Sequence, residues 1–322
     1  MPPSSVAPAV SAPGRAGRTV ARLPPTSFLL TSAVFHYLGP SLAVLLFVHI
    51  QALGVAWIRI AAAAVFFAIW RRPWRIWRNA QPAQRRVFLG LGVVLAAMNA
   101  LFYLAIARLP LSTVGAIEFL GTVILAALGA RTRRNLLALV LAVGGVAVLT
   151  DVRLSGQPLG FVFAFANCIG FMLYVMLGHR IANTSADGAD TAQGASPMSG
   201  IDQLGLSMLI AAVVATPFGI GYAGTAFTRP LWLAWGIGVG LCSSVIPYVT
   251  DQLAMARLKR STFALMLALL PAAATVIGFV VLGQVPTLRD LAGITLVIIG
   301  VAVHHEPAQT PPLRPAPATS AE

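Results

Sequence analysis

An uncharged apolar run extends from Val87 to Ala107, and it limits the folds open to this chain more than any other feature. After a turn marked by Arg108 and Pro110, a second apolar stretch follows with a single carboxylate, Glu118, inside it. Each stretch is long enough to cross the hydrocarbon core of a bilayer as a helix. The two stretches therefore predict a transmembrane helical hairpin, because only helices and closed barrels satisfy their backbone inside lipid.

The composition extends this prediction to the whole chain. Hydrophobic residues make up 58% of the sequence and charged residues 10%, whereas ordinary soluble domains carry about 25% charged residues. A net charge of +13 would suggest a nucleic-acid partner in a soluble protein. Here the positive residues lie in short segments between apolar spans, where they set membrane topology. The composition thus indicates an all-α membrane protein and argues against a nucleic-acid partner.

Ten apolar spans can be counted along the chain. They fall near residues 28–48, 52–70, 87–106, 111–129, 135–150, 159–178, 203–222, 231–255, 262–282 and 290–303. Segments 1–26 and 303–322 are rich in proline and alanine and cannot form a core, which predicts disordered tails. The spans predict ten transmembrane helices between these two tails.

The basic residues predict the orientation of these helices, since Lys and Arg favour cytoplasmic loops. With the N-terminus in the cytoplasm, 17 of the 22 basic residues fall on inner segments, four fall on outer loops, and Arg59 lies within a span. Both termini are therefore expected to lie in the cytoplasm.

The two halves of the chain contain related segments. Residues 105–113 (AIARLPLST) resemble residues 254–262 (AMARLKRST), and each segment joins a third and a fourth span of its half. Because five spans is an odd number, two copies of five must face opposite sides of the membrane. The pattern predicts two inverted five-helix repeats, residues 27–150 and 151–302, with a cytoplasmic linker near 179–202. Secondary transporters have this architecture and bind their substrate between the repeats.

Two segments also resemble a known family. MNALFYLAIARLPLSTVGAIEFLG and VIPYVTDQLAMARLKRSTFALMLALLP are similar to EamA-type members of the drug/metabolite transporter superfamily, and most similar to the threonine and homoserine exporter branch. The resemblance covers about residues 28–303. It implies ten helices in two inverted repeats, the bacterial inner membrane, and proton-driven efflux of amino acids or related metabolites. The chain departs from the branch pattern at Thr122, Asp251 and Leu270, where that pattern has proline, glutamate and an acid.

Glu118 is the first candidate for a functional residue. It lies about 12 Å of helix beyond Pro110, which marks the outer end of its span. A carboxylate at that depth is costly to insert, so such groups are by default functional. We interpret Glu118 as a site for a proton or a substrate ammonium, with an ion pair to Arg59 as the structural alternative. The small residues Gly115 and Gly121 of the same helix predict close packing.

Asp251 and Pro247 form a second candidate site in the eighth span. Asp251 precedes Arg257 by about 9 Å of helical rise, which places it near the cytoplasmic surface. Pro247 lacks an N–H and frees a backbone carbonyl, so it predicts a bend and a polar site close to Asp251. The alternative is an acid that reaches the interface and pairs with Arg257 or Lys259.

Arg59 lies too deep in the second span to be a flanking residue. Its planar guanidinium matches a substrate carboxylate, and it is equally suited to be the counter-ion of Glu118. Four further polar residues are candidates for lining a substrate cavity: Asn99, Tyr103, Asn167 and Tyr174. Hydrogen bonding between helices is the commoner use of such residues. In the ninth span, Pro271 predicts a hinge or a packing position.

Nothing in the sequence indicates an enzyme. No glycine-rich phosphate loop with a lysine occurs, and the run His304, His305 and Glu306 lacks the spacing of metal ligands on a rigid scaffold. We therefore expect a transporter without cofactor or metal, whose partners are a small-molecule substrate, a proton and membrane lipids. The sequence does not decide between a monomer and a homo-oligomer. Drug efflux or metabolite uptake within the same superfamily are the alternatives, and a membrane-embedded enzyme is the alternative from another class.

Overall fold

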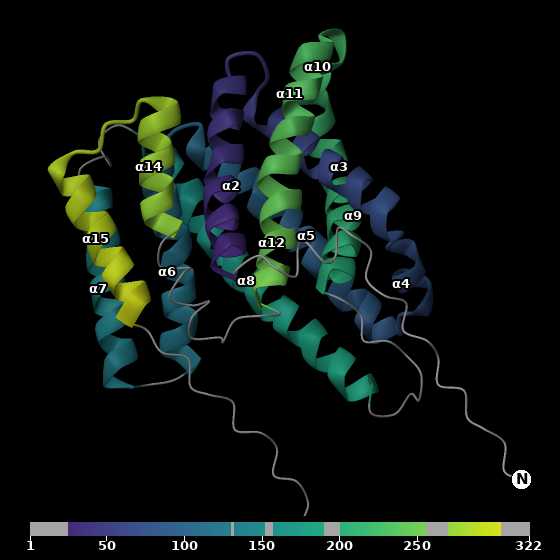
Figure 1. Cartoon of the computed structure of the whole chain (residues 1–322), viewed down its shortest axis with the longest axis horizontal. Coiled ribbons are helices and arrows are strands. Elements are labelled where there is room, and N and C mark those ends of the chain that lie inside the picture. The colour runs from purple at the N-terminus through teal and green to yellow at the C-terminus, as the bar shows by residue number, and fades with distance from the viewer. Residues whose placement is uncertain (1–24, 130–131, 152–156, 190–199, 256–269, 304–322) are drawn as a thin grey trace, which may run out of the picture.

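The computed structural model describes residues 25–129, 132–151, 157–189, 200–255 and 270–303. Over these residues the secondary structure is helical, with no β-strand (Figure 1). The longer helices are α2 (Pro25–Leu46), α3 (Ala52–Arg71), α5 (Pro82–Ile106), α6 (Leu111–Gly129), α7 (Arg133–Asp151), α8 (Pro158–Ala189), α9 (Gly200–Gly219), α11 (Pro230–Gly240), α12 (Ile246–Met255), α14 (Leu270–Leu282) and α15 (Leu288–Val303). The short elements are α4 (Trp74–Asn79), η1 (Ile220–Ala223), α10 (Gly224–Thr228) and the π-helical turn η2 (Leu241–Val245).

These helices overlap each of the ten predicted spans, although some of their ends differ. α5 begins at Pro82, ahead of the predicted start, because proline suits the first helical turn and the Gln84 side chain accepts a hydrogen bond from the Gln81 N–H. α8 continues to Ala189, into the predicted linker, since no proline interrupts that polar segment. The eighth span is divided into α11, η2 and α12. The predicted tails and residues 262–269 of the ninth span lie almost wholly outside the described residues.

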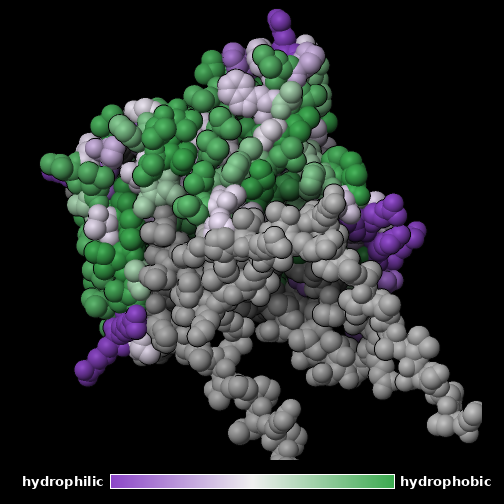
Figure 2. Space-filling view, viewed as in Figure 1, coloured by the Kyte–Doolittle hydropathy of each residue, from purple (hydrophilic) through white to green (hydrophobic). Residues whose placement is uncertain are grey.

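Five helical stretches are long and apolar enough to cross a membrane, judged by length and composition. They are Ala52–Arg71, Pro82–Ile106, Pro158–Leu177, Ile201–Thr228 and Pro230–Thr250, and shorter apolar helices cover Leu30–Leu46, Leu111–Gly121 and Leu270–Leu282. Large apolar side chains such as Ile69 and Val280 are 76% and 70% exposed. Figure 2 shows a hydrophobic surface along the helices, with strongly hydrophilic residues near the ends of the bundle. Such a surface suits contact with lipid, while the number of crossings stays a prediction.

The contacts between long helices come in related pairs. α5 packs on α8 and α2 packs on α12; likewise, α6 packs on α8 and α2 packs on α14. α3 packs on α9 and α7 packs on α15, at opposite edges of the bundle in Figure 1. If α11, η2 and α12 count as one helix, each half of the chain has five long helices. When each helix of the first half is exchanged for the helix at the same position in the second half, the α5–α8 and α6–α8 contacts become the α12–α2 and α14–α2 contacts. The α3–α9 and α7–α15 contacts are unchanged by this exchange.

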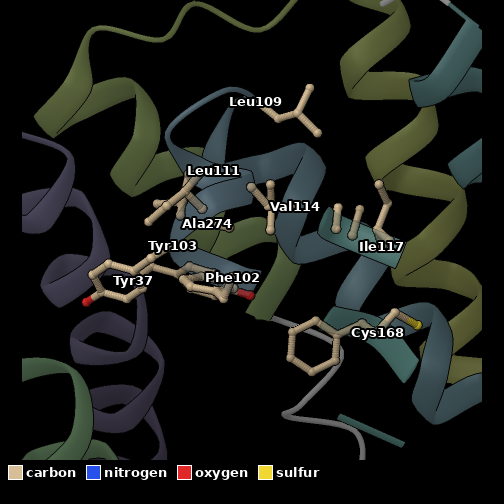
Figure 3. Close-up of a cluster of buried hydrophobic side chains, with 14 of the residues drawn as sticks. Tyr37, Phe102, Tyr103, Leu109, Leu111, Val114, Ile117, Cys168 and Ala274 are labelled. Atoms are coloured by element: carbon tan, nitrogen blue, oxygen red, sulfur yellow. The ribbon is translucent and has the colours of Figure 1, made fainter. Parts of the chain in front are cut away.

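α6 lies in the interior of the bundle. Every residue from Leu111 to Gly121 is buried, and the helix contacts α7, α8, α14 and α15. Its neighbours form a hydrophobic cluster that includes Tyr37 of α2 and Tyr103 of α5 (Figure 3). Because protein surrounds this part of α6, Glu118 is held inside the bundle and does not face lipid.

α7 and α15 approach so closely that one glycine leaves no room for a side chain. A Cβ atom built on Gly145 would lie 2.5 Å from the Gly293 carbonyl oxygen, whereas one built on Gly144 meets nothing within 4 Å. We expect Gly145→Ala to lower the free energy of unfolding by about 1–3 kcal/mol, because the helices must separate. Gly144→Ala is the matched control and should be neutral or slightly stabilising through helix propensity. Thermal unfolding in detergent compares the two, and equal melting temperatures would contradict this packing.

Candidate functional site

Arg59 of α3 joins three helical elements in the interior of the bundle. Its side chain is 7% exposed. Nε donates a hydrogen bond to the Ser244 hydroxyl and Nη2 donates to the Ser243 carbonyl oxygen, each at 3.0 Å. Nη1 donates to the Asn99 side-chain oxygen, and the guanidinium carbon lies 5.4 Å from the centroid of the Tyr103 ring. Arg59 therefore connects α3 to α5 and to the π-helical turn η2.

The acceptor at Ser243 follows from the sequence of the eighth span. In an α-helix the Ser243 carbonyl would accept from the N–H four residues later, but residue 247 is proline and has none. The chain passes through the π-turn η2 at this point, and π-turns are frequent at functional sites. Arg59 supplies the missing donor. The sequence predicted a freed carbonyl at Pro247; in the structure that carbonyl binds Arg59, and the Asp251 side chain lies outside the described residues.

Five buried side chains of α2, α5, α6 and α8 carry polar atoms that form no hydrogen bond with any described residue: Tyr37, Tyr103, Thr113, Glu118 and Asn167. A Cβ atom built on Gly115 would lie 2.9 Å from the Tyr37 hydroxyl, which places this hydroxyl one turn from Glu118. The Asn167 side chain of α8 lies beside the Glu118 carboxyl, and the Arg59 guanidinium is close enough for its charge to act on that carboxyl. Buried polar groups in proteins are nearly always hydrogen-bonded. We therefore treat these side chains as candidates for contact with a polar ligand.

We call Tyr37, Arg59, Asn99, Tyr103, Glu118 and Asn167 the interior polar cluster. Its members come from α2, α3, α5 and α6 of the first half and from α8 of the second. The cluster contains a guanidinium, a carboxyl, two amides and two phenols. It therefore offers donors for an anionic group and acceptors for a cationic one.

The structural alternative for Arg59 and Glu118 was a direct ion pair. No such pair forms between Arg59 and Glu118. Among the described residues, the ion pair with a nitrogen–oxygen distance within 4.0 Å is that of Arg71 and Asp202. Three of the five Arg59 N–H groups are used by Ser244, Ser243 and Asn99. In this conformation Arg59 is thus tied to neighbouring helices and Glu118 is left without a counter-ion in contact.

The remaining predicted residues lie apart from the interior polar cluster or pack beside it. Tyr174 lies about 10 Å of helix beyond Asn167 and packs near Phe171 in other hydrophobic clusters. At Gly121, a built Cβ atom would lie 2.9 Å from Met172 Cγ, so α6 and α8 are in close contact there. Pro271 is buried at the start of α14. The side chain of Thr122 lies outside the described residues.

Sequence reasoning missed Tyr37 and Ser244, and it predicted the carbonyl freed by Pro247 without predicting that Arg59 binds it. Tyr37 lies in a helix with no charged residue nearby, and nothing in the sequence distinguished its hydroxyl from that of other tyrosines. The freed carbonyl belongs to Ser243, because Ser243 stands four residues before Pro247, which has no N–H to donate in an α-helix. Ser244 could not have been identified from the sequence, because its bond to Arg59 depends on how α3 packs against η2.

A separate cavity of about 140 Å³ lies at the N-terminal end of α6. Its lining residues are Pro110, Ser112, Gln284, Val285, Pro286 and Asp290. None of them belongs to the interior polar cluster. Among the described residues, no group of three or more His, Cys, Asp or Glu side chains is arranged to hold a metal ion.

Comparison with known proteins gives three results. A model of the EamA-like transporter family matches residues 191–304. The threonine/homoserine exporter RhtA of Escherichia coli (strain K12) is 32% identical over 260 residues, which cover 81% of this chain and 84% of the exporter. The protein of that name from Salmonella typhimurium (strain LT2) is 31% identical over 255 residues, covering 77% and 80%. One solved crystal structure, 17% identical, matches with a TM-score of 0.52 over 87% of this chain and 98% of that chain, which shows a shared fold.

Proposed function

The chain belongs to the EamA-like transporter family, and we propose that it exports small amino acids of the threonine and homoserine type, or related metabolites, across the bacterial inner membrane. The family assignment confirms the resemblance found in the sequence and makes the protein a membrane transporter. The proposed substrate class is supported by relatives named as threonine/homoserine exporters, which match about four-fifths of the chain.

The observation that carries this proposal is the interior polar cluster. An amino acid presents a carboxylate and an ammonium group a few ångströms apart. Arg59 keeps two N–H groups beyond those it gives to Ser244, Ser243 and Asn99, and a guanidinium fork matches a carboxylate. The Glu118 carboxyl is buried without a counter-ion in contact and accepts an ammonium or a proton. The phenol and amide groups of Tyr37 and Asn167 suit the polar side chain of the substrate.

We further propose that transport is coupled to protons and proceeds by alternating access between two inverted five-helix repeats. The paired helix contacts support this, because exchanging the halves reproduces them, and secondary transporters bind substrate where such repeats meet. In this mechanism a proton and the substrate ammonium compete for Glu118. Binding of one releases the other, so the proton gradient drives export.

Counterflow tests the proposed substrate class. Proteoliposomes that contain the full-length protein are loaded with unlabelled threonine, and the entry of radiolabelled threonine is followed. We expect transient accumulation that excess homoserine abolishes and that a hydrophobic drug cation leaves unchanged. Accumulation of the drug but not of threonine would overturn the substrate assignment in favour of drug efflux by the same fold.

A further inference from the structure

The segment that joins α3 to α5 forms a compact surface of arginines and tryptophans. α4 occupies the centre of this segment and packs against α9. Ile76 and Trp77 turn toward the bundle and contact a small hydrophobic cluster around Phe88. The opposite face of α4 carries Trp74, which is 45% exposed, and the exposed Arg75 and Arg78.

Positive charge dominates this surface, which we call the arginine–tryptophan patch: Trp70, Arg71, Arg72, Trp74, Arg75, Trp77, Arg78, Arg85 and Arg86. Among the described residues, only Arg71 of these arginines forms an ion pair, at 2.5 Å to Asp202. The other five arginines have no carboxylate of a described residue within ion-pairing distance. Figure 2 shows strongly hydrophilic residues at the edge of the molecule where Figure 1 places α4, beside the hydrophobic surface of the helices.

The tryptophans and arginines of the patch are arranged together. The Arg85 guanidinium lies 5.5 Å from the centroid of the Trp77 ring and donates to the Arg78 carbonyl oxygen at 3.2 Å, so the start of α5 folds back over α4. The Arg71 guanidinium lies 5.7 Å from the Trp70 ring, and Trp70 is 48% exposed at the end of a membrane-length helix. Indole rings at this level favour the bilayer interface, and guanidinium groups bind phosphate oxygens by paired hydrogen bonds.

We propose that the arginine–tryptophan patch binds the phosphate headgroups of anionic phospholipids in the adjacent leaflet. The exposed Trp70 and Trp74 lie at the boundary between the headgroups and the acyl chains, and Arg75, Arg78 and Arg86 contact the phosphates. The complementary charge and the apolar surface beside the patch select a lipid over a soluble anion. This site is separate from the interior polar cluster, so it does not depend on the transported substrate.

The test is lipid binding by the full-length protein. Purified protein in neutral detergent is titrated with phosphatidylglycerol or phosphatidylcholine, and bound lipid is counted by native mass spectrometry. We expect the wild type to prefer phosphatidylglycerol. Arg75→Gln with Arg78→Gln should weaken that binding by on the order of tenfold or more, because each arginine near an anionic surface contributes about fivefold.

The matched control is Arg133→Gln with Arg134→Gln, which removes the same charge from two exposed arginines at the start of α7. The control should bind phosphatidylglycerol as the wild type does. Equal weakening in both double variants would mean that only net charge acts, and undiminished binding in the Arg75 and Arg78 variant would mean that the patch is not the site. Either result overturns the proposal. Displacement of the lipid by millimolar inorganic phosphate would also overturn it, in favour of a site for a soluble anion.

Discussion

We expect the Glu118→Gln variant to lose efflux driven by a proton gradient, down to the background of liposomes without protein. Glutamine keeps the size of the side chain and its capacity for hydrogen bonds, but it neither titrates nor carries a negative charge. Since α6 is surrounded by protein at this position, the substitution acts on the interior polar cluster and not on a lipid contact. The measurement is efflux of radiolabelled threonine from proteoliposomes with an imposed pH gradient.

A second measurement on the same variant separates two roles of Glu118. If the carboxyl carries only the proton, threonine counterflow without a gradient should persist in Glu118→Gln. If it binds the substrate ammonium, counterflow should disappear as well. Asp202→Asn is the matched control, because it also converts a carboxylate to an amide but at the Arg71 ion pair, and it should retain both activities. Efflux by Glu118→Gln at the wild-type rate would exclude the proton role.

The sequence was sufficient to place the helices because an apolar span of bilayer length is a local property. The run from Val87 to Ala107 and the stretch after Pro110 correspond to α5 and α6. The division of the eighth span was only partly predictable: Pro247 indicated a bend, but the π-turn η2 depends on how α2 and α3 pack against it. A Cβ atom built on Gly39 of α2 would lie 2.3 Å from the Ser243 side chain, and no local pattern indicates a contact that close.

The site was less predictable because its contacts join residues far apart in the chain. Coulomb attraction between the two buried charges of opposite sign suggested a pair of Arg59 and Glu118. The structure instead gives Arg59 three oxygen acceptors on α5 and η2. Neutral acceptors can satisfy a buried guanidinium when several of them converge on its planar fork. Helix packing decides which acceptors converge on the guanidinium. The sequence therefore predicts that a buried arginine needs acceptors but not which residues supply them.

We expect the Arg59→Met variant to lose both transport and stability. The substitution removes donors to the Asn99 side-chain oxygen and to the Ser243 carbonyl, and each buried acceptor left without a donor costs about 1–3 kcal/mol. Arg59→Lys keeps the charge but not the planar fork, so it should restore part of the stability and little of the transport. Thermal unfolding in detergent and threonine counterflow measure the two effects.

A double variant tests whether Arg59 acts only by joining helices. Arg59→Met with Asn99→Leu replaces both partners of one buried hydrogen bond by apolar groups, which can be nearly neutral for folding. We expect this double variant to recover part of the melting temperature lost in Arg59→Met while threonine transport stays absent. The control is Arg108→Gln, since Arg108 donates to Leu104 and lies over the Phe163 ring, away from the interior polar cluster. If transport returned together with stability in the double variant, Arg59 would be a helix-joining residue that does not contact the substrate.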